Sequence, residues 1–220
     1  MHNNKFFSHF MHFLQKIGAI LPAIFWLMML YAFDEPLAAT LTLLAAIIHE
    51  AGHQIYIYLV LGRPGNMRST LCGFRISKGS ILSYKTEALI YFSGPLANIL
   101  CAVILIPILL FVSENAEAYL QLFIIINLAT AASNLLPIER YDGYGILECI
   151  FAYYGIREAA MSILSFISLL LSSFICILAL YIMARIGDGY WIFGIFIFSL
   201  ISGISKSLGN KFQVFRSKTE

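Results

Sequence analysis

Two histidines and a glutamate lie together in the middle of a long apolar run, residues 37–61. The segment reads His49-Glu-Ala-Gly-His53, so the two imidazoles are four residues apart. This spacing places both on one face of an α-helix, where they can bind one metal ion while Glu50 handles a proton. Ionisable side chains in an apolar helix are costly at membrane depth unless they have a partner. A bound cation is the simplest such partner, so we expect a metal site here.

A third ligand must come from elsewhere, because a hydrolytic zinc site usually has three protein ligands and a water. The other histidines all lie within the first 12 residues, where we expect solvated side chains. Asp142 is the best candidate, since Pro137 disfavours helix before it and Gly143 permits a turn beside it. An aspartate on such a break can point inward to a metal, but from spacing alone it could equally cap a helix.

Another polar element, Ser93-Gly-Pro-Leu-Ala-Asn98, lies inside a different apolar run. Gly94 and Pro95 are expected to loosen the helix, and Asn98 is a lone amide among apolar residues. Asn98 could bond to a neighbouring helix, or it could donate to a substrate carbonyl or a developing oxyanion. The residues alone leave both interpretations open.

The composition predicts an all-α polytopic membrane protein. The chain has 220 residues, of which 60% are hydrophobic and 12% charged, and its mean hydropathy is +0.83. We expect about six transmembrane helices, at residues 17–33, 37–61, 88–112, from 118 with a break at 134–142, 159–184 and 190–204. They would form one domain, residues 1–220, with a catalytic core at about 37–155. The net charge of +2 suggests no nucleic-acid partner. Four scattered cysteines without a CxxC pair indicate buried thiols rather than a disulfide framework.

The basic residues predict the orientation in the membrane. Every Lys and Arg except Arg185 lies on one side of the expected helices. The positive-inside rule then places both termini in the cytoplasm. The loop of residues 63–85 is expected to form a short β-hairpin, with strands at 69–77 and 80–84 around a turn at Lys78-Gly79. This hairpin is either a plain cytoplasmic turn or a sheet edge that pairs with an extended substrate.

Taken together, three ordered motifs resemble the site-2 protease family of intramembrane zinc metalloproteases. They are the His49–His53 segment, the Gly94–Asn98 segment and Asn134-Leu-Leu-Pro-Ile-Glu-Arg-Tyr-Asp-Gly143. The resemblance covers residues 45–147, and three motifs in this order are far more specific than HExxH alone. Two positions depart from the family pattern: Tyr141 replaces the usual Leu, and Tyr144 replaces a common second Gly.

The resemblance implies one Zn²⁺ per chain, held by His49, His53 and Asp142, with Glu50 as general base. It implies that Asn98 and Asn134 are polar positions near the substrate. The implied activity is regulated intramembrane proteolysis of membrane-anchored proteins, with a regulatory membrane protein as a further partner. No segment is long enough for a PDZ insertion or a C-terminal regulatory domain, so the chain is similar to the compact branch that processes membrane-tethered transcription-factor precursors in sporulating bacteria. The location implied is the bacterial cytoplasmic membrane.

Three alternatives remain. A membrane protease that trims prenylated C-termini resembles HExxH paired with a later glutamate, and Glu148 would be that ligand. A catalytically silent membrane protein could bind and sequester client segments, although the intact His49, Glu50 and His53 argue against it. A transporter could use buried His and Glu as a proton relay, but the chain shows no inverted repeat. The sequence does not indicate the substrate, the cleavage site, the need for a prior cut or the oligomeric state.

Overall fold

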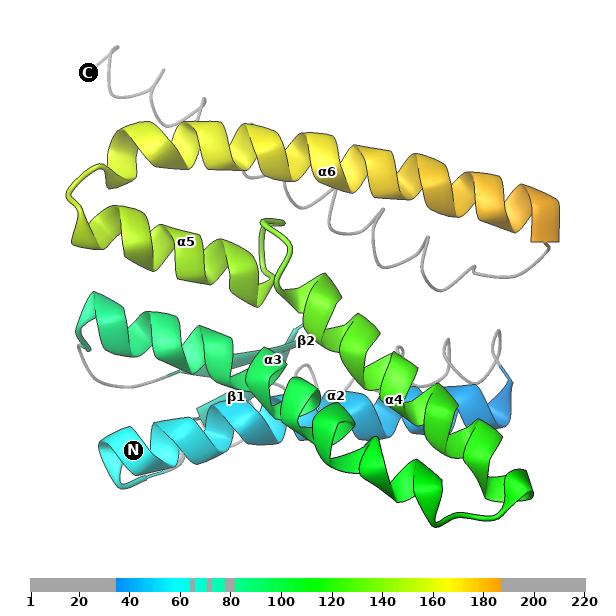
Figure 1. Cartoon of the computed structure of the whole chain (residues 1–220). Helices are drawn as coiled ribbons and strands as arrows, with labels where there is room; N and C mark the ends of the chain where they lie inside the picture. Colours follow the sequence, from blue (N-terminus) through cyan, green and yellow to red (C-terminus); the bar gives the residue numbers. More distant parts are fainter. Residues whose placement is uncertain (1–34, 64–65, 71–72, 78–81, 187–220) are drawn as a thin grey trace, which may run out of the picture.

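The computed structural model describes residues 35–63, 66–70, 73–77 and 82–186 (Figure 1). Within them, four helices are long and apolar enough to cross a membrane. They are α2 (Pro36–Leu61), α3 (Tyr84–Leu105, extended by the 3₁₀ turn η1 at Pro107–Leu110), α4 (Glu114–Asn134) and α6 (Arg157–Ile186). A further helix, α5 (Asp142–Tyr153), has 12 residues and is too short to span a bilayer.

Helix α3 is the centre of the described arrangement, because it packs against α2, α4 and α5 (Figure 1). Its contact with α2 depends on Gly52. A Cβ added there would lie 2.5 Å from the Ser93 carbonyl oxygen and 2.6 Å from the Ala97 Cβ. The absence of a side chain at Gly52 therefore lets the two helices approach closely, at the level of the two histidines.

The ends of α2 and α3 carry ordinary helix signals. Pro36 begins α2, where a missing N–H costs nothing, and Gly62 ends it in the left-handed conformation (φ 66°). Ser83 caps α3 by accepting a hydrogen bond from the Thr86 N–H at 3.2 Å. Pro95 lies inside α3, but the helix continues through it to Leu105.

The chain breaks between α4 and α5, as the sequence predicts. Helix α4 ends at Asn134 and α5 begins at Asp142. A turn closes the break, because the Tyr141 N–H donates to the Ile138 carbonyl at 3.0 Å. The residue with positive φ in this turn is Arg140 (φ 81°), whereas Gly143 is part of the helix. The expectation that Gly143 provides a turn conformation is therefore wrong.

Helix α6 fixes the break from the other side. The Ser168 hydroxyl accepts a hydrogen bond from the Glu139 backbone N–H at 2.7 Å, and the Ser165 and Tyr144 hydroxyls lie 3.1 Å apart. Tyr144, one of the two departures from the family pattern, thus contacts α6 and is buried. Figure 1 shows α5 between α3 and α6.

The expected second to fifth crossings correspond to α2, α3, α4 and α6. The third begins at Tyr84 rather than at residue 88. The expected first and sixth crossings lie outside the described residues.

The structure gives two short strands, β1 (Asn66–Thr70) and β2 (Gly73–Ser77), paired antiparallel with Thr70 opposite Gly73. The strand boundaries expected from the sequence are wrong, because residues 69–77 are shared between two strands instead of forming one. Tyr84 begins α3 instead of ending a strand, and the expected turn at Lys78-Gly79 lies outside the described residues.

Candidate metal centre

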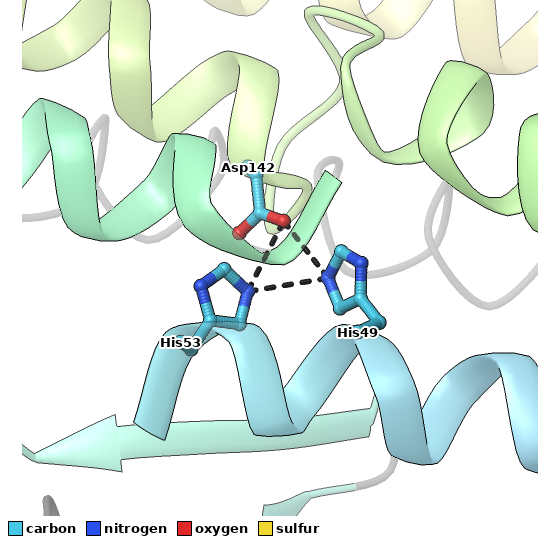
Figure 2. Close-up of side chains that lie close together, drawn as sticks. All are labelled: His49, His53 and Asp142. Carbon is cyan, nitrogen blue, oxygen red and sulfur yellow. Dashed lines mark hydrogen bonds and ion pairs between the residues drawn. The ribbon is translucent and has the colours of Figure 1, made fainter. Parts of the chain in front are cut away.

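Helix α2 directs His49 and His53 toward the N-terminus of α5, where Asp142 faces them (Figure 2). The two histidines are one helical turn apart, and each is 6% exposed. Asp142 is the first residue of α5, and the capping position is Tyr141. The structure thus brings together the three ligands predicted from the sequence, although His49 and His53 are about 90 positions away from Asp142. The Asp142 carboxylate points at the imidazoles.

Three atoms form a small triangle at the centre of this group. The His49 Nε2 and His53 Nε2 atoms lie 3.0 Å and 3.3 Å from the Asp142 Oδ2 atom, and 3.2 Å from each other. An ion with tetrahedral bonds of about 2.0–2.1 Å holds its ligand atoms about 3.3 Å apart. The triangle therefore has nearly the size of one face of such a coordination shell.

The outer nitrogens of the two imidazoles determine which tautomer each ring adopts. His53 Nδ1 lies 2.7 Å from the Ile90 carbonyl oxygen, which can only accept, so His53 must donate from Nδ1. His49 Nδ1 lies 2.9 Å from Oδ1 of Asn98 and donates in the same way. In the neutral rings, both Nε2 atoms then carry lone pairs that point into the triangle.

Two lone pairs and a carboxylate oxygen facing one another repel unless a cation lies between them. Asp142 Oδ2 is buried and receives no hydrogen bond within the described part of the chain. The donor set of two imidazoles and one carboxylate, at this spacing, suits a divalent ion such as zinc and leaves a coordination position open for water or substrate. The described residues therefore form a group that could hold a metal ion.

Two glycines make room for this group. A Cβ added at Gly94 on α3 would collide with the His53 ring and would lie 2.9 Å from His49 Cε1. A Cβ added at Gly143 would collide with the Leu135 carbonyl, so this glycine lets α5 begin close to the chain that leaves α4. Gly94 therefore fits the imidazoles, and Gly143 fits the backbone that brings Asp142 to them.

Glu50 supplies a carboxylate beside the metal ligands. It is only partly buried, but its Oε2 atom is inaccessible to solvent and has no hydrogen-bond partner among the described residues. A buried carboxylate oxygen without a donor is costly, and such groups are found where a ligand, water or proton is to be received. Glu50 can thus accept a proton next to the triangle.

The hydrogen bonds of Asn98 do not match a role in binding the substrate. It is 0% exposed, and its Nδ2 atom donates both hydrogens, to the Ala45 carbonyl and to Asn127 Oδ1, at 2.9 Å each. These bonds match the helix-packing interpretation and leave no N–H for a substrate oxygen. Asn134 ends α4 half-buried, and its amide donates to the Thr130 carbonyl at 2.9 Å.

Sequence reasoning missed Asn127, a completely buried amide on α4. Its signal was available: Asn127 is flanked by apolar residues and lies seven positions before Asn134. The rival ligand Glu148 pairs instead with Arg157, at 2.5 Å, and the group of described residues that could hold a metal ion contains Asp142 rather than Glu148.

Comparison with known proteins gives a likeness among solved structures. No protein-family model matches the chain, and no curated protein matches it. Among solved structures, a site-2 protease from Methanocaldococcus jannaschii is similar, with a TM-score of 0.60, 19% sequence identity, and coverage of 87% of this chain and 88% of that one. The resemblance predicted from three motifs is thus confirmed at the level of architecture: the chain has the fold of a site-2 protease.

Proposed function

We propose that this protein is an intramembrane zinc metalloprotease that hydrolyses peptide bonds of membrane-tethered proteins. The observation that carries the proposal is the triangle of His49, His53 and Asp142, which joins α2, a helix long and apolar enough to span a bilayer, to the first residue of the short helix α5. The neighbouring carboxylate of Glu50 has an oxygen, Oε2, that receives no hydrogen bond from the residues that the structure describes. One zinc ion per chain, regulated intramembrane proteolysis and a bacterial cytoplasmic membrane with both termini inside belong to the same proposal.

The residues of the site would have three different roles in hydrolysis. His49, His53 and Asp142 would hold zinc, which when bound lowers the pKa of a water toward about 7 and polarises a carbonyl. Glu50 would take the proton from the attacking water and deliver it to the leaving amine. Asn134, at the end of α4 and half-buried, is the remaining amide that could position the substrate.

The substrate must be extended where it is cut, because a helix hides its carbonyls in hydrogen bonds. A membrane-anchored protein with a helix-destabilising stretch is therefore the expected substrate. Pairing of that stretch with a β-hairpin edge, and control by a regulatory membrane protein, remain parts of the proposal.

The first prediction separates metal binding from catalysis. Glu50→Gln should keep the metal and abolish cleavage, because the amide cannot accept the proton, whereas Asp142→Ala should lose the metal. The measurement is the zinc-to-protein ratio of purified protein, together with cleavage of a model transmembrane substrate, with and without a zinc chelator. Glu148→Gln is the control, since Glu148 pairs with Arg157 and should keep both properties.

Each alternative predicts a different result. A silent binding protein would retain zinc and leave the model substrate intact even as wild type. A protease with a glutamate ligand would lose zinc in Glu148→Gln and keep it in Asp142→Ala. Proteolysis by purified Glu50→Gln at the wild-type rate would contradict the proposed mechanism.

A further inference from the structure

A chain of hydrogen bonds runs from the metal site through two buried asparagines to a third helix. His49 Nδ1 donates to Asn98 Oδ1 at 2.9 Å, and Asn98 Nδ2 donates to Asn127 Oδ1 at 2.9 Å. Asn127 Nδ2 in turn donates to the Phe123 carbonyl at 2.9 Å. The chain therefore connects α2, α3 and α4, and every donor in it points away from the metal site.

The direction of this chain is fixed by backbone carbonyls. The Ala45 and Phe123 carbonyl oxygens can only accept, so each must face the NH₂ group of its asparagine. Asn127 is thereby held with its oxygen toward Asn98, and Asn98 with its oxygen toward His49. An oxygen at that position requires His49 to carry its proton on Nδ1, which leaves the Nε2 lone pair free.

Burial makes this arrangement sensitive to the loss of any member. Asn98 and Asn127 are both 0% exposed and lie among apolar helices. If Asn127 lost its side-chain oxygen, one N–H of Asn98 would remain buried without a partner, which is unfavourable. The Asn98 amide would then gain by rotating toward another acceptor, and His49 would lose the contact that selects its tautomer.

We propose that Asn127 is a positioning residue for the metal centre, acting through Asn98 to hold His49 in the tautomer that binds metal. The inference deepens the proposed function and rests on it only for the consequence for proteolysis. Asn127 itself need touch neither the metal nor the substrate.

The test measures metal binding by the purified full chain in the absence of substrate. Metal-free wild type and Asn127→Leu are titrated with Zn²⁺ against a competing chelator. Outer-shell changes at metal-binding histidines typically cost 10–100-fold in affinity, and we expect a loss of about 10-fold, because Ala45 still holds one N–H of Asn98. The control is Thr130→Val, which removes a hydroxyl that bonds to the Ile126 carbonyl of the same helix, and whose affinity should equal that of wild type.

A double-mutant cycle shows whether Asn127 acts through its hydrogen bond to Asn98 or through a general loss of packing. In an Asn98→Leu background, Asn127→Leu should leave zinc affinity unchanged, because the connection to His49 is already broken. ¹⁵N NMR of histidine-labelled metal-free protein, recorded at a pH where the spectrum shows His49 to be neutral, should show its proton on Nδ1 in wild type and partly on Nε2 in Asn127→Leu.

The inference is overturned if Asn127→Leu binds zinc as tightly as wild type, or lowers the affinity equally in both backgrounds. It is also overturned if the His49 tautomer does not change. These outcomes are independent of the proposed function. Wild type could bind zinc and fail to cut any substrate while Asn127→Leu still weakens zinc binding through His49. Conversely, wild type could cut a substrate while Asn127→Leu has no effect on zinc binding.

Discussion

At the scale of single residues, the site depends on a glycine, which has no side chain, as much as on the side chains that form it. The two imidazoles fit against α3 only because residue 94 is glycine. Their outer nitrogens are then used by Ile90 and Asn98, which leaves the inner nitrogens free to face Asp142. A metal-binding geometry of this kind is therefore set by the neighbours of the ligands as well as by the ligands.

Gly94→Ala tests this fit. The added methyl would collide with the His53 ring and crowd His49, so the imidazoles must move and the triangle must distort. We expect zinc affinity to fall by at least ~10-fold, as for other changes in the shell around metal-bound histidines. Chelator competition on the purified protein measures the change.

Leu96→Ala is the matched control on the same helix, because Leu96 is 37% exposed on the surface of α3 and should leave zinc affinity unaltered. If Gly94→Ala bound zinc as tightly as wild type, the close fit between α3 and the imidazoles would be refuted.

The residues that could be identified from the sequence were those whose types and spacing are typical of a metal site. His49 and His53 follow from their separation, and Asp142 follows from the break and the family resemblance. The partners of Asn98 could not be predicted, because they depend on which helices pack together. Asn127 was not predicted for the same reason, because the role of a lone amide in an apolar run depends on the partner that another helix brings to it.

At the scale of elements, the break between α4 and α5 is what delivers Asp142. Its existence was predictable from Pro137, but its conformation was not, since Arg140 and not a glycine adopts positive φ. The break is also tied to α6 through the Ser168 hydroxyl, a contact between residues 29 positions apart that local sequence cannot indicate.

Ser168→Ala should weaken this attachment. The Glu139 N–H would lose its partner in a partly buried place, and loss of one such hydrogen bond costs about 1 kcal/mol. We expect a lower melting temperature and slower cleavage, because the segment before Asp142 becomes less constrained. Thermal unfolding in detergent and a cleavage assay provide the two measurements.

Ser173→Ala is the control for this change, since the Ser173 hydroxyl bonds to the Leu169 carbonyl of its own helix at 2.8 Å. Equal melting temperatures for Ser168→Ala and Ser173→Ala would show that the contact with α6 does not hold the break.

At the scale of the whole molecule, the candidate metal centre joins parts of the chain that are distant in sequence. Two ligands come from α2 and one from the start of α5. Helix α3 lies against both and supplies the acceptors for the outer nitrogens. A bound ion would therefore act as a cross-link between α2 and α5, and stability should depend on metal as well as on apolar packing.

Metal removal should consequently lower the melting temperature of the wild-type protein. A ligand that binds only the folded state adds about 4 kcal/mol of stability when its free concentration is ~1,000 times its dissociation constant. Thermal unfolding of chelator-treated protein, before and after Zn²⁺ is restored, measures the shift. Mg²⁺ should not replace Zn²⁺, because it prefers oxygen ligands in octahedral geometry. In Asp142→Ala the effect of Zn²⁺ should be strongly reduced, and an undiminished shift there would mean that the stabilising ion binds somewhere other than between α2 and α5.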